Sequence, residues 1–487
     1  MEQKDKKIYL TTPIYYVNSK PHIGHAYATL AVDVLARFYK QQGKDVFFLT
    51  GTDEHGAKIA QAAQKANQEP QQFCDEVSNL FKDTWENLNI DYSYFIRTTD
   101  KNHEEKVKEF LNVLKEKGFL YEGDYLGKYC VGCEKFITEK ELVDGKCPDH
   151  KTEPQEIAEK NWFFKLKTFL PKIQQLIEKD IILINPSNAK AEVLGVIKQG
   201  LEDVSISRQS VSWGIKLPWD KEQTVYVWVD ALLNYWTALE NLNKTDFWPS
   251  DLHLVGRDIL KFHCIFWPAL ILAYYGEDAF NQLPKQIFCH GYFTIDGQKM
   301  SKTIGNVVDP NDLIKKYGVE ATRYLLLTQF PFGNDGDVSL SRLDEKYNSD
   351  LASGLGNLVA RVITLARKSK AKSQKSKLQV KNQKSEQNIL EVKEKYQIAI
   401  ENLKIDEALS TVWGLIGSCD KVVATEKPWE NGNEKLKIKN EKVIEELLFV
   451  LQEIAELLKP FMPQTAENIL EQVKTGKSKP LFPRLNS

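Results

Sequence analysis

Two histidines flank a glycine where an extended segment gives way to a helical pattern. In PHIGHAY, Pro21 ends the extended segment, and Gly24 lies between His22 and His25 where the helix starts. The first turn of a helix offers unpaired backbone N–H groups and partial positive charge, which bind phosphate oxygens. Imidazoles can donate further hydrogen bonds, and a glycine lets a flat ring lie on the backbone. The stretch predicts a nucleotide site, with two capping or surface histidines as the alternative.

A second stretch, DGQKMSKTIGN, places two lysines on a loop bounded by glycines. Lys299 and Lys302 lie between Gly297 and Gly305. A hinged loop of this kind can close on a bound phosphate chain and stabilise the charge that develops there. Considered by itself, the stretch fits a solvated basic turn better.

Four potential metal ligands follow a paired spacing. Cys130 and Cys133 form C-x2-C, and Cys147 and His150 form C-x2-H after a short loop rich in turn residues. Three thiolates and one imidazole suit tetrahedral Zn²⁺, and four protein ligands leave no open position for catalysis. The pattern predicts a structural zinc site, with unrelated buried cysteines as the alternative. The total of seven cysteines is odd, which favours a reducing compartment over disulfides.

The elements that must position these groups alternate between strands and helices in the first part of the chain. Apolar runs of strand length alternate with segments of helical period, which is typical of an α/β fold with a parallel sheet. The composition shifts from about Leu120 to Asp149, as in an inserted module, and the α/β pattern then returns. The expected strands and helices are 8–16, 23–41, 45–51 and 57–66, and after the insertion 224–236, 252–263 and 286–293.

Beyond about Asn311 the periodicity is helical, and we expect a helical bundle with no further strand. The lysine-rich stretch Lys368 to Glu386 has almost no large apolar residues and is expected to be a mobile loop or a frayed helix end.

Size and composition limit the class of protein. A chain of 487 residues is expected to form two to four domains. The apolar fraction of 42% is ordinary, and a net charge of -2 excludes a global polyanion-binding surface. The amino-terminal apolar run is interrupted too early for a signal peptide, and the longest later one contains Pro268. We expect a cytoplasmic protein with no membrane association.

The first two stretches together resemble the paired signatures of class I aminoacyl-tRNA synthetases, His-x-Gly-His and Lys-Met-Ser-Lys-Ser. The second signature ends in Thr303 here, which leaves both lysines in place. The chain has neither a G-x-x-x-x-G-K-[ST] loop nor a G-x-G-x-x-G after a strand, so the common alternative nucleotide sites are missing.

Three further stretches resemble the methionyl-tRNA synthetase family: TGTDEHG from Thr50, VYVWVDALLNYW from Val225 and GRDILKFH from Gly256. By this resemblance Asp53 and the backbone near Ile14 hold the α-ammonium group of methionine, and Asp258 binds the ribose of ATP. Leu232 stands where some relatives have proline. A polarizable thioether suits aromatic faces, and an ammonium suits a carboxylate. The other methionine-binding residues that the resemblance implies are Tyr16, Trp228, Ala231, Leu232, Tyr235, Phe262 and His263. Taken singly, the aromatic residues also fit core positions, and Asp53 also fits a helix N-cap.

The same resemblance places the anticodon site on GNLVAR and EKPW. Asn357 and Arg361 are four residues apart and share a helical face, and Trp429 follows Pro428. Single-stranded RNA is bound by stacking bases on aromatic rings and by hydrogen bonds from amide or guanidinium groups. For Trp429 alone, a partly buried packing residue is the alternative.

The implied fold is a Rossmann-like catalytic domain of α/β class, split by a zinc-bearing insertion and followed by an α-helical bundle that binds the anticodon. The expected division is 1–117 and 223–310 for the two catalytic halves, 118–222 for the insertion, 311–355 for a linking helical segment and 356–487 for the bundle.

The implied activity is ATP-dependent formation of methionyl adenylate and transfer of methionine to tRNA(Met). The signature residues His22, His25, Lys299 and Lys302 stabilise the transition state, Gly24 and Asp258 complete the ATP site, and Mg²⁺ accompanies ATP. We expect a monomer, with any proofreading in the synthetic pocket. The alternatives are a class I enzyme for cysteine or a branched aliphatic amino acid, and a non-catalytic tRNA-binding relative.

Overall fold

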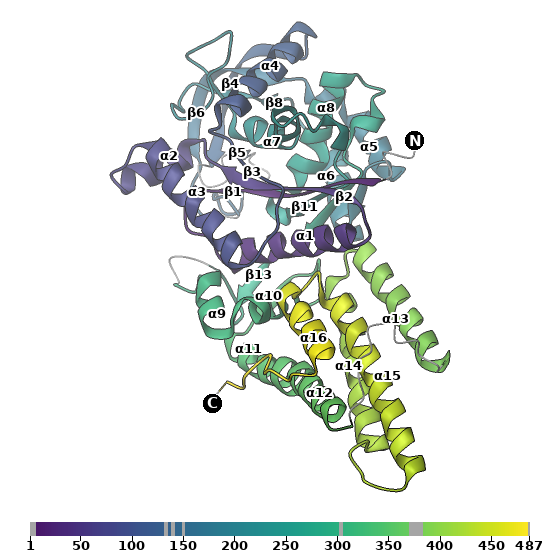
Figure 1. Ribbon diagram of the computed structural model, residues 1–487. Helices are drawn as coiled ribbons and strands as arrows, with labels where there is room; N and C mark the ends of the chain where they lie inside the picture. Colours follow the sequence, from purple (N-terminus) through teal and green to yellow (C-terminus); the bar gives the residue numbers. More distant parts are fainter. Residues whose placement is uncertain are drawn as a thin grey trace. The chain divides into compact units, whose positions relative to one another are not determined.

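The computed structural model describes residues 6–130, 135–137, 142–148, 151–300, 305–369 and 383–485. The chain forms two compact units (Figure 1). The first comprises the described residues within Met1–Pro21, Gln42–Trp85 and Asp91–His290, and the second those within His22–Gln41, Glu86–Ile90 and Gly291–Ser487. Within the described residues, every helix is too short or too polar to span a lipid bilayer.

A six-stranded sheet in which every pair is parallel organises the first unit. The strand order is β3-β2-β1-β11-β12-β7. β2 is buried at every residue after the first, as expected for a strand that is covered on both faces. The strands are β1 Lys7–Tyr16, β2 Asp45–Asp53, β3 Tyr94–Arg97, β7 Leu183–Asn185, β11 Leu252–Gly256 and β12 Gln286–His290. The parallel sheet predicted from the sequence is therefore confirmed.

A second, antiparallel sheet of order β5-β4-β6-β8 follows the first part of this fold. Its strands are β4 Leu120–Cys130, β5 Lys135–Ile137, β6 Gln155–Phe164 and β8 Val204–Ser205. The short strands β9 Ser207–Arg208 and β10 Thr224–Val225 pair with each other in a separate antiparallel sheet. β7 comes from the same stretch of chain but joins the edge of the parallel sheet.

The helices of the first unit include α7, which is buried on nearly all sides: its first thirteen residues are buried, and ten of them are apolar or aromatic. The helices are α2 Ala57–Lys65, α3 Pro70–Asn87, α4 Lys101–Glu116, α5 Leu170–Glu178, α6 Ser187–Gln199, α7 Val227–Asn241 and α8 Trp267–Tyr275, with all but the last residues of α3 in this unit.

The second unit is mainly helical, and α1 covers the range Ile23–Gln41 that the sequence predicts. Asp309 caps α9 by accepting a hydrogen bond from the Asn311 N–H, and Pro310 occupies the first turn. The other helices are α9 Pro310–Tyr317, α10 Val319–Leu327, α11 Leu340–Lys346, α12 Asn357–Ser369, α13 Gln383–Glu401, α14 Ile405–Glu426, α15 Glu434–Leu458 and α16 Pro463–Thr475. In Figure 1, α14 and α15 run side by side, as in the predicted bundle.

One expectation for this region is wrong. The strand β15, Gly336–Val338, pairs in parallel with β13, Phe293–Ile295, which also pairs with β14, Gln298–Lys299. Three residues are too few to show a strand period in the sequence, so the strand was not predicted. Most of the lysine-rich stretch, residues 370–382, lies outside the described residues.

Candidate active site

The carboxyl ends of β1, β2 and β11 carry the first group of predicted site residues. The sequence order of the strands reverses between β1 and β11, and such a switch point is where parallel sheets bind ligands. Ile14 and Tyr16 of β1 pair with Gly51 and Asp53 of β2. Asp53 is 2% exposed. Because α2 starts only at Ala57, with Gly56 at its N-cap, the N-cap alternative for Asp53 is excluded.

The helix α7 presents four predicted residues with helical spacing. Trp228, Ala231, Leu232 and Tyr235 occur at i, i+3, i+4 and i+7, and all are buried. The Trp228 ring stacks on Phe262 with 4.0 Å between centroids and 6° between planes. Tyr16 meets Trp228 edge to face at 6.4 Å, so the predicted aromatic residues form one cluster.

Phe262 and His263 begin a π-helical turn, Phe262–Phe266, a geometry that often occurs at functional sites. His263 Nδ1 lies 3.0 Å from the carbonyl oxygen of Ile259 and so carries the proton. His263 Nε2 therefore accepts the hydrogen bond from the Tyr235 hydroxyl, at 2.8 Å. Burial lowers the pKa of His263 to about 4, partly offset by the Ile259 carbonyl. The imidazole is neutral at pH 7, which suits an uncharged thioether.

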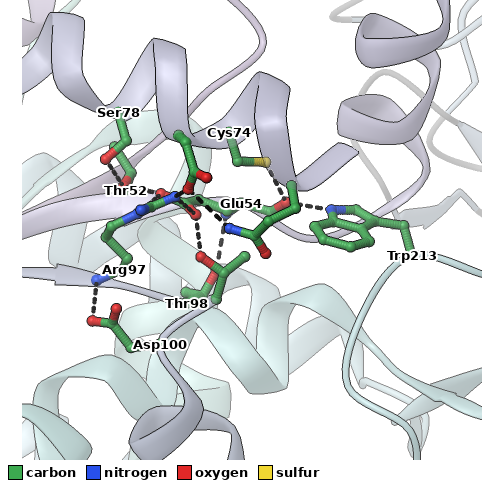
Figure 2. A network of polar contacts seen from close by, with 11 residues as sticks. Thr52, Glu54, Cys74, Ser78, Arg97, Thr98, Asp100 and Trp213 are labelled. Carbon is green, nitrogen blue, oxygen red and sulfur yellow. Dashed lines mark hydrogen bonds and ion pairs between the residues drawn. The ribbon is translucent and has the colours of Figure 1, made fainter. Parts of the chain in front are cut away.

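The residue after Asp53 is held by a polar network that the sequence did not predict (Figure 2). Arg97 donates to the two carboxylate oxygens of Glu54 from Nε and Nη2, each at 2.8 Å, and its Nη2 also reaches Asp75 Oδ1 at 2.6 Å. Thr52 Oγ1 donates to the same carboxylate at 2.7 Å. Glu54 is wholly buried, and this paired geometry is what makes a buried carboxylate tolerable.

The backbone of Glu54 is fixed as well. Its N–H donates to Thr98 Oγ1 at 2.9 Å, and its carbonyl accepts from Trp213 Nε1 at 2.6 Å and from Cys74 Sγ at 3.4 Å (Figure 2). The Gly56 N–H donates to the Trp213 carbonyl at 3.1 Å. The segment that follows Asp53 is thus bonded to α3, to the residues after β3 and to the loop of Trp213.

The two signature histidines stack at the start of α1, with 3.7 Å between ring centroids. The His22 backbone N–H donates to His25 Nδ1 at 3.2 Å, and the Gly24 N–H donates to His22 Nδ1 at 3.1 Å. Burial and the neighbouring His22 lower the pKa of His25 well below its ordinary value. A neutral His25 ring therefore stacks on the His22 ring at a helix N-terminus, with 25° between the ring planes.

The second signature approaches the same helix start within the second unit. A methyl group placed on Gly24 would lie 3.3 Å from Met300 Cε. The Ile23 N–H donates to the Val308 carbonyl at 3.1 Å. Residues 301–304, which include Lys302, lie outside the described residues, and Met300 and Val308 flank them. Lys299 ends β14, which places it next to Met300 in the chain.

Asp258, the predicted ribose ligand, is exposed in the single turn Arg257–Ile259 just after β11. It bends back over the strand end, because a methyl group on Gly256 would lie 2.8 Å from Asp258 Oδ1. His290, at the end of β12, faces the same point, with Nε2 3.6 Å away from it.

Two of the four predicted metal ligands are described. Cys130 and Cys147 are buried in one small cluster with Ile137 and Leu142. The chain turns tightly around Cys147, whose carbonyl accepts from the Lys151 N–H at 2.8 Å. Cys133 and His150 lie outside the described residues, and the described part of the chain contains no group of three metal-ligating side chains. The two buried thiol groups in one cluster fit the donor set that zinc requires.

The predicted anticodon residues lie in the second unit. Asn357 is exposed at the start of α12, and Arg361 Nη1 lies 3.4 Å from Asp420 Oδ1 of α14. Trp429 is 50% exposed, so half of its side chain is accessible to solvent. It follows the end of α14 at Glu426, about 9 Å of helix beyond Asp420.

The polar residues that sequence reasoning missed are the buried Glu54, His55, His103, Arg208 and Asp230 and the partly buried Arg97. A signal existed for Asp230, because a carboxylate inside an otherwise apolar helix needs buried partners. Arg208 also lies over the Tyr226 ring, with 4.0 Å from Cζ to the centroid.

Comparison with known families decides the class. The model of "tRNA synthetases class I (M)" matches residues 8–159 and 150–363, and that of "Anticodon-binding domain of tRNA ligase" matches residues 382–483. The chain belongs to the class I methionyl-tRNA synthetases. The methionine–tRNA ligase of Caldanaerobacter subterraneus subsp. tengcongensis is 41% identical over 480 residues, which cover 96% of this chain and 74% of that protein. The Thermotoga maritima methionine–tRNA ligase is 40% identical over 479 residues, covering 96% and 75%.

Solved structures of methionyl-tRNA synthetases have the same fold. The Mycobacterium tuberculosis methionyl-tRNA synthetase in complex with methionyl-adenylate superposes with a TM-score of 0.89 at 33% identity, over 99% of both chains. The apo form of the same protein gives a TM-score of 0.83 at 30% identity, again over 99% of both chains.

Proposed function

We infer that this chain is an ATP-dependent methionine–tRNA ligase. It activates L-methionine to methionyl adenylate and transfers the methionyl group to the 3′-terminal adenosine of tRNA(Met). The observation that carries this conclusion is the match to methionine–tRNA ligases at about 40% identity over nearly the whole chain.

We propose that the predicted residues around β1, β2 and α7 bind methionine. The Asp53 carboxylate, with the backbone near Ile14, takes the α-ammonium group. Tyr16, Trp228 and Phe262 form the aromatic wall around the thioether, together with Ala231 and Leu232. Tyr235 and neutral His263 close the pocket, and their mutual hydrogen bond at 2.8 Å supports a pocket without net charge there.

For the chemistry, the methionine carboxylate attacks the α-phosphorus of ATP and pyrophosphate leaves with the electrons of the broken P–O bond. A ribose hydroxyl of the tRNA terminus then attacks the methionyl carbonyl carbon, and AMP leaves. No protein nucleophile is needed, so the protein contributes positioning and charge stabilisation.

The proposed ATP site consists of Gly24, His22, His25, Asp258, Lys299 and Lys302. The histidines and lysines stabilise the negative charge on the phosphates as the α-phosphorus is attacked, and Asp258 binds the ribose hydroxyls. Mg²⁺ that enters with ATP supplies further charge neutralisation to the phosphate oxygens. The proximity of Met300 to Gly24 supports a shared role for the two signatures.

Zinc is proposed to be structural, held by Cys130, Cys133, Cys147 and His150. The burial of both described cysteines in one cluster supports it. For the tRNA, Asn357, Arg361 and Trp429 are proposed to read the anticodon, and the exposure of Trp429 leaves its ring accessible to a base.

The domain division at residues 117, 222, 310 and 355 remains our proposal, as do a monomeric state, a cytoplasmic location and proofreading within the synthetic pocket. The location is inferred from the C-x2-C and C-x2-H set, which needs reduced thiols.

Pyrophosphate exchange into ATP, measured with each of the twenty amino acids, tests the function. Exchange with methionine alone is the expected result. Exchange with cysteine or a branched aliphatic amino acid instead would favour a sibling enzyme, and no exchange with any amino acid would favour a tRNA-binding relative. Lys302→Ala and His25→Ala are expected to slow exchange far more than they weaken methionine binding, and unchanged exchange would refute their roles.

A further inference from the structure

A row of buried polar side chains joins the segment after β2 to α7 and α4. His55 Nδ1 lies 2.7 Å from Asp230 Oδ2, and His103 Nε2 lies 2.7 Å from Asp230 Oδ1. His103 Nδ1 lies 2.7 Å from Thr237 Oγ1, about two helical turns beyond Asp230 in α7. All four residues are at most 3% exposed.

The row consists of one carboxylate between two imidazoles, and its protonation follows from that geometry. A buried carboxylate without partners is costly, and here each oxygen receives one imidazole N–H. Burial opposes the charge of Asp230, but His55 and His103 outweigh it and lower the pKa of Asp230. Burial likewise opposes the charge of His55, but Asp230, Glu104 and Glu54 raise the pKa of His55. His55 and Asp230 thus each favour the charged form of the other, and this contact at 2.7 Å is the His55–Asp230 ion pair.

The loop end of this ion pair is rigid. His55 follows Glu54, whose side chain and backbone are bonded to Arg97, Thr98 and Trp213 as described above (Figure 2). The His55 ring also meets the Trp213 ring at 5.4 Å between centroids. Asp53, two residues before His55, cannot move along β2 without disturbing these contacts.

The helix end of the ion pair lies inside the predicted pocket wall. Asp230 lies between Trp228 and Ala231 in the sequence of α7, and Tyr235 is little more than one turn beyond it. The Tyr235 carbonyl accepts from the Tyr9 hydroxyl of β1 at 2.7 Å, which holds the far part of α7 to the sheet. The ion pair therefore ties the first turns of α7 to the segment that carries Asp53.

We propose that the His55–Asp230 ion pair is a positioning element that sets the separation between the Asp53 carboxylate and the aromatic face of α7. It thereby selects amino acids by the length of their side chain. Its role rests on the proposed methionine site, because Asp53 and α7 provide the two ends that methionine must span. His103 supports Asp230 from the opposite side and fixes its rotamer.

The test uses the full chain in steady-state pyrophosphate exchange. Three quantities are measured: the KM for methionine, the KM for ATP, and the selectivity for methionine over ethionine, which is one methylene longer. Asp230→Asn keeps the shape but removes the charge. We expect the KM for methionine to rise about tenfold, the KM for ATP to stay within about twofold, and the preference for methionine to fall. Glu109→Gln is the control, because this exposed carboxylate of α4 pairs with Lys106 away from the row, and it should leave all three quantities unchanged.

A second pair of variants covers the case in which Asp230→Asn does not fold. His55→Asn retains an N–H donor near the position of Nδ1, whereas His55→Ala does not. We expect His55→Ala to raise the KM for methionine about tenfold and His55→Asn to restore it to within about threefold of the wild-type value. A merely structural role would lower the melting temperature in both without this rescue.

Two outcomes separate the possible failures. If Asp53→Asn raises the KM for methionine but folded Asp230→Asn and His55→Ala do not, the positioning role is overturned and the methionine site stands. If Asp53→Asn itself leaves the KM for methionine unchanged, the proposed site is wrong, and the positioning role is wrong with it.

Discussion

Arg323 of α10 donates from Nη2 to Asp33 Oδ2 of α1 across 2.6 Å, and neither side chain is exposed to solvent. Arg323 Nε donates to the Phe461 carbonyl at 2.7 Å, and Nη1 donates to the Leu88 carbonyl at 3.0 Å. One guanidinium therefore joins the helix that starts with the signature histidines to the turn between α15 and α16. The position of α1 depends on this single buried charge pair and its backbone partners.

Arg323→Leu should destabilise the protein strongly, because it removes the guanidinium that pairs with the fully buried Asp33 carboxylate. Breaking a buried pair from one side typically costs about 3–5 kcal/mol. Urea denaturation measures the loss. Lys404→Ala, which removes the exposed pair with Glu407, is the control and should change the free energy of unfolding by less than about 1 kcal/mol. A loss as small as the control's in Arg323→Leu would contradict the argument.

Arg97→Lys should destabilise the segment after Asp53. Lysine keeps the charge but has a single nitrogen, so it cannot bond both oxygens of Glu54 together with Asp75. Loss of one or two charge-assisted hydrogen bonds predicts about 2 kcal/mol less stability, measured by thermal denaturation. Arg257→Lys changes a more exposed ion pair with Glu192 and should leave the melting temperature unchanged. An equal loss of stability in the two variants would count against a special role for Arg97.

Stability should fall on mild acidification because of His263. The unfolded chain binds a proton near its ordinary pKa of 6.5, whereas the folded chain does so only at about 4. The unfolded state therefore binds more protons between these values, and stability decreases as the pH falls through that window.

The contribution of His263 to this pH dependence of stability can be measured with His263→Asn, which lacks the titrating group. The difference in unfolding free energy between wild type and variant should shrink by up to about 1.4 kcal/mol per pH unit below 6.5. Urea denaturation at several pH values between 7 and 5 measures it. A difference that does not vary with pH would show that folding leaves the pKa of His263 at its ordinary value.

Gly24→Ala should lower the activity without lowering the stability. The added methyl group would lie 2.9 Å from His22 Cε1, which forces the imidazole out of its stack on His25 but leaves the helix intact. We expect pyrophosphate exchange to fall by at least about tenfold with little change in melting temperature. Gly195→Ala in α6 has open space at the new methyl group and should keep full activity, with up to about 1 kcal/mol more stability. Full activity in Gly24→Ala would argue against a close contact between substrate and this backbone.

Cys147→Ser should remove bound zinc and lower the melting temperature, because a structural metal contributes folding free energy. Metal content by atomic absorption and thermal denaturation measure the two effects. Cys419→Ser changes a buried thiol in α14, outside the motif, and should retain zinc. Zinc-free wild-type protein, or Cys147→Ser with zinc still bound, would exclude the proposed ligand set.

Local pattern was sufficient for the elements that carry the signatures. The apolar residues that give α1 its helical period are close together in the chain, and so are those that form the short apolar runs of β1 and β2. The sequence alone therefore indicates which of these residues are buried. The residues of the aromatic cluster, among them Trp228 and Phe262, were named through the family resemblance, because taken singly each also fits a core position. The strand β15 was missed, since three residues show no period and are defined only by pairing with β13.

The polar partners could not be predicted in the same way. Asp230 is 175 residues from His55 and 127 from His103, and Asp33 is 290 residues from Arg323. A charged residue in an apolar helix indicates that it has a buried partner, but it does not indicate which of the many titratable residues that partner is. That choice depends on the order of strands in the sheet and on how the helices pack.

By itself the sequence determined the fold class, and through the resemblance of its signature stretches it determined the family, because both depend on patterns within single segments. Only the tertiary structure decided which buried charges pair and how Asp53 is held relative to α7. The physical reason is that the spacing of apolar residues within one segment shows which side of that segment is buried. The partner of a buried charge, in contrast, comes from another segment that meets it only after folding.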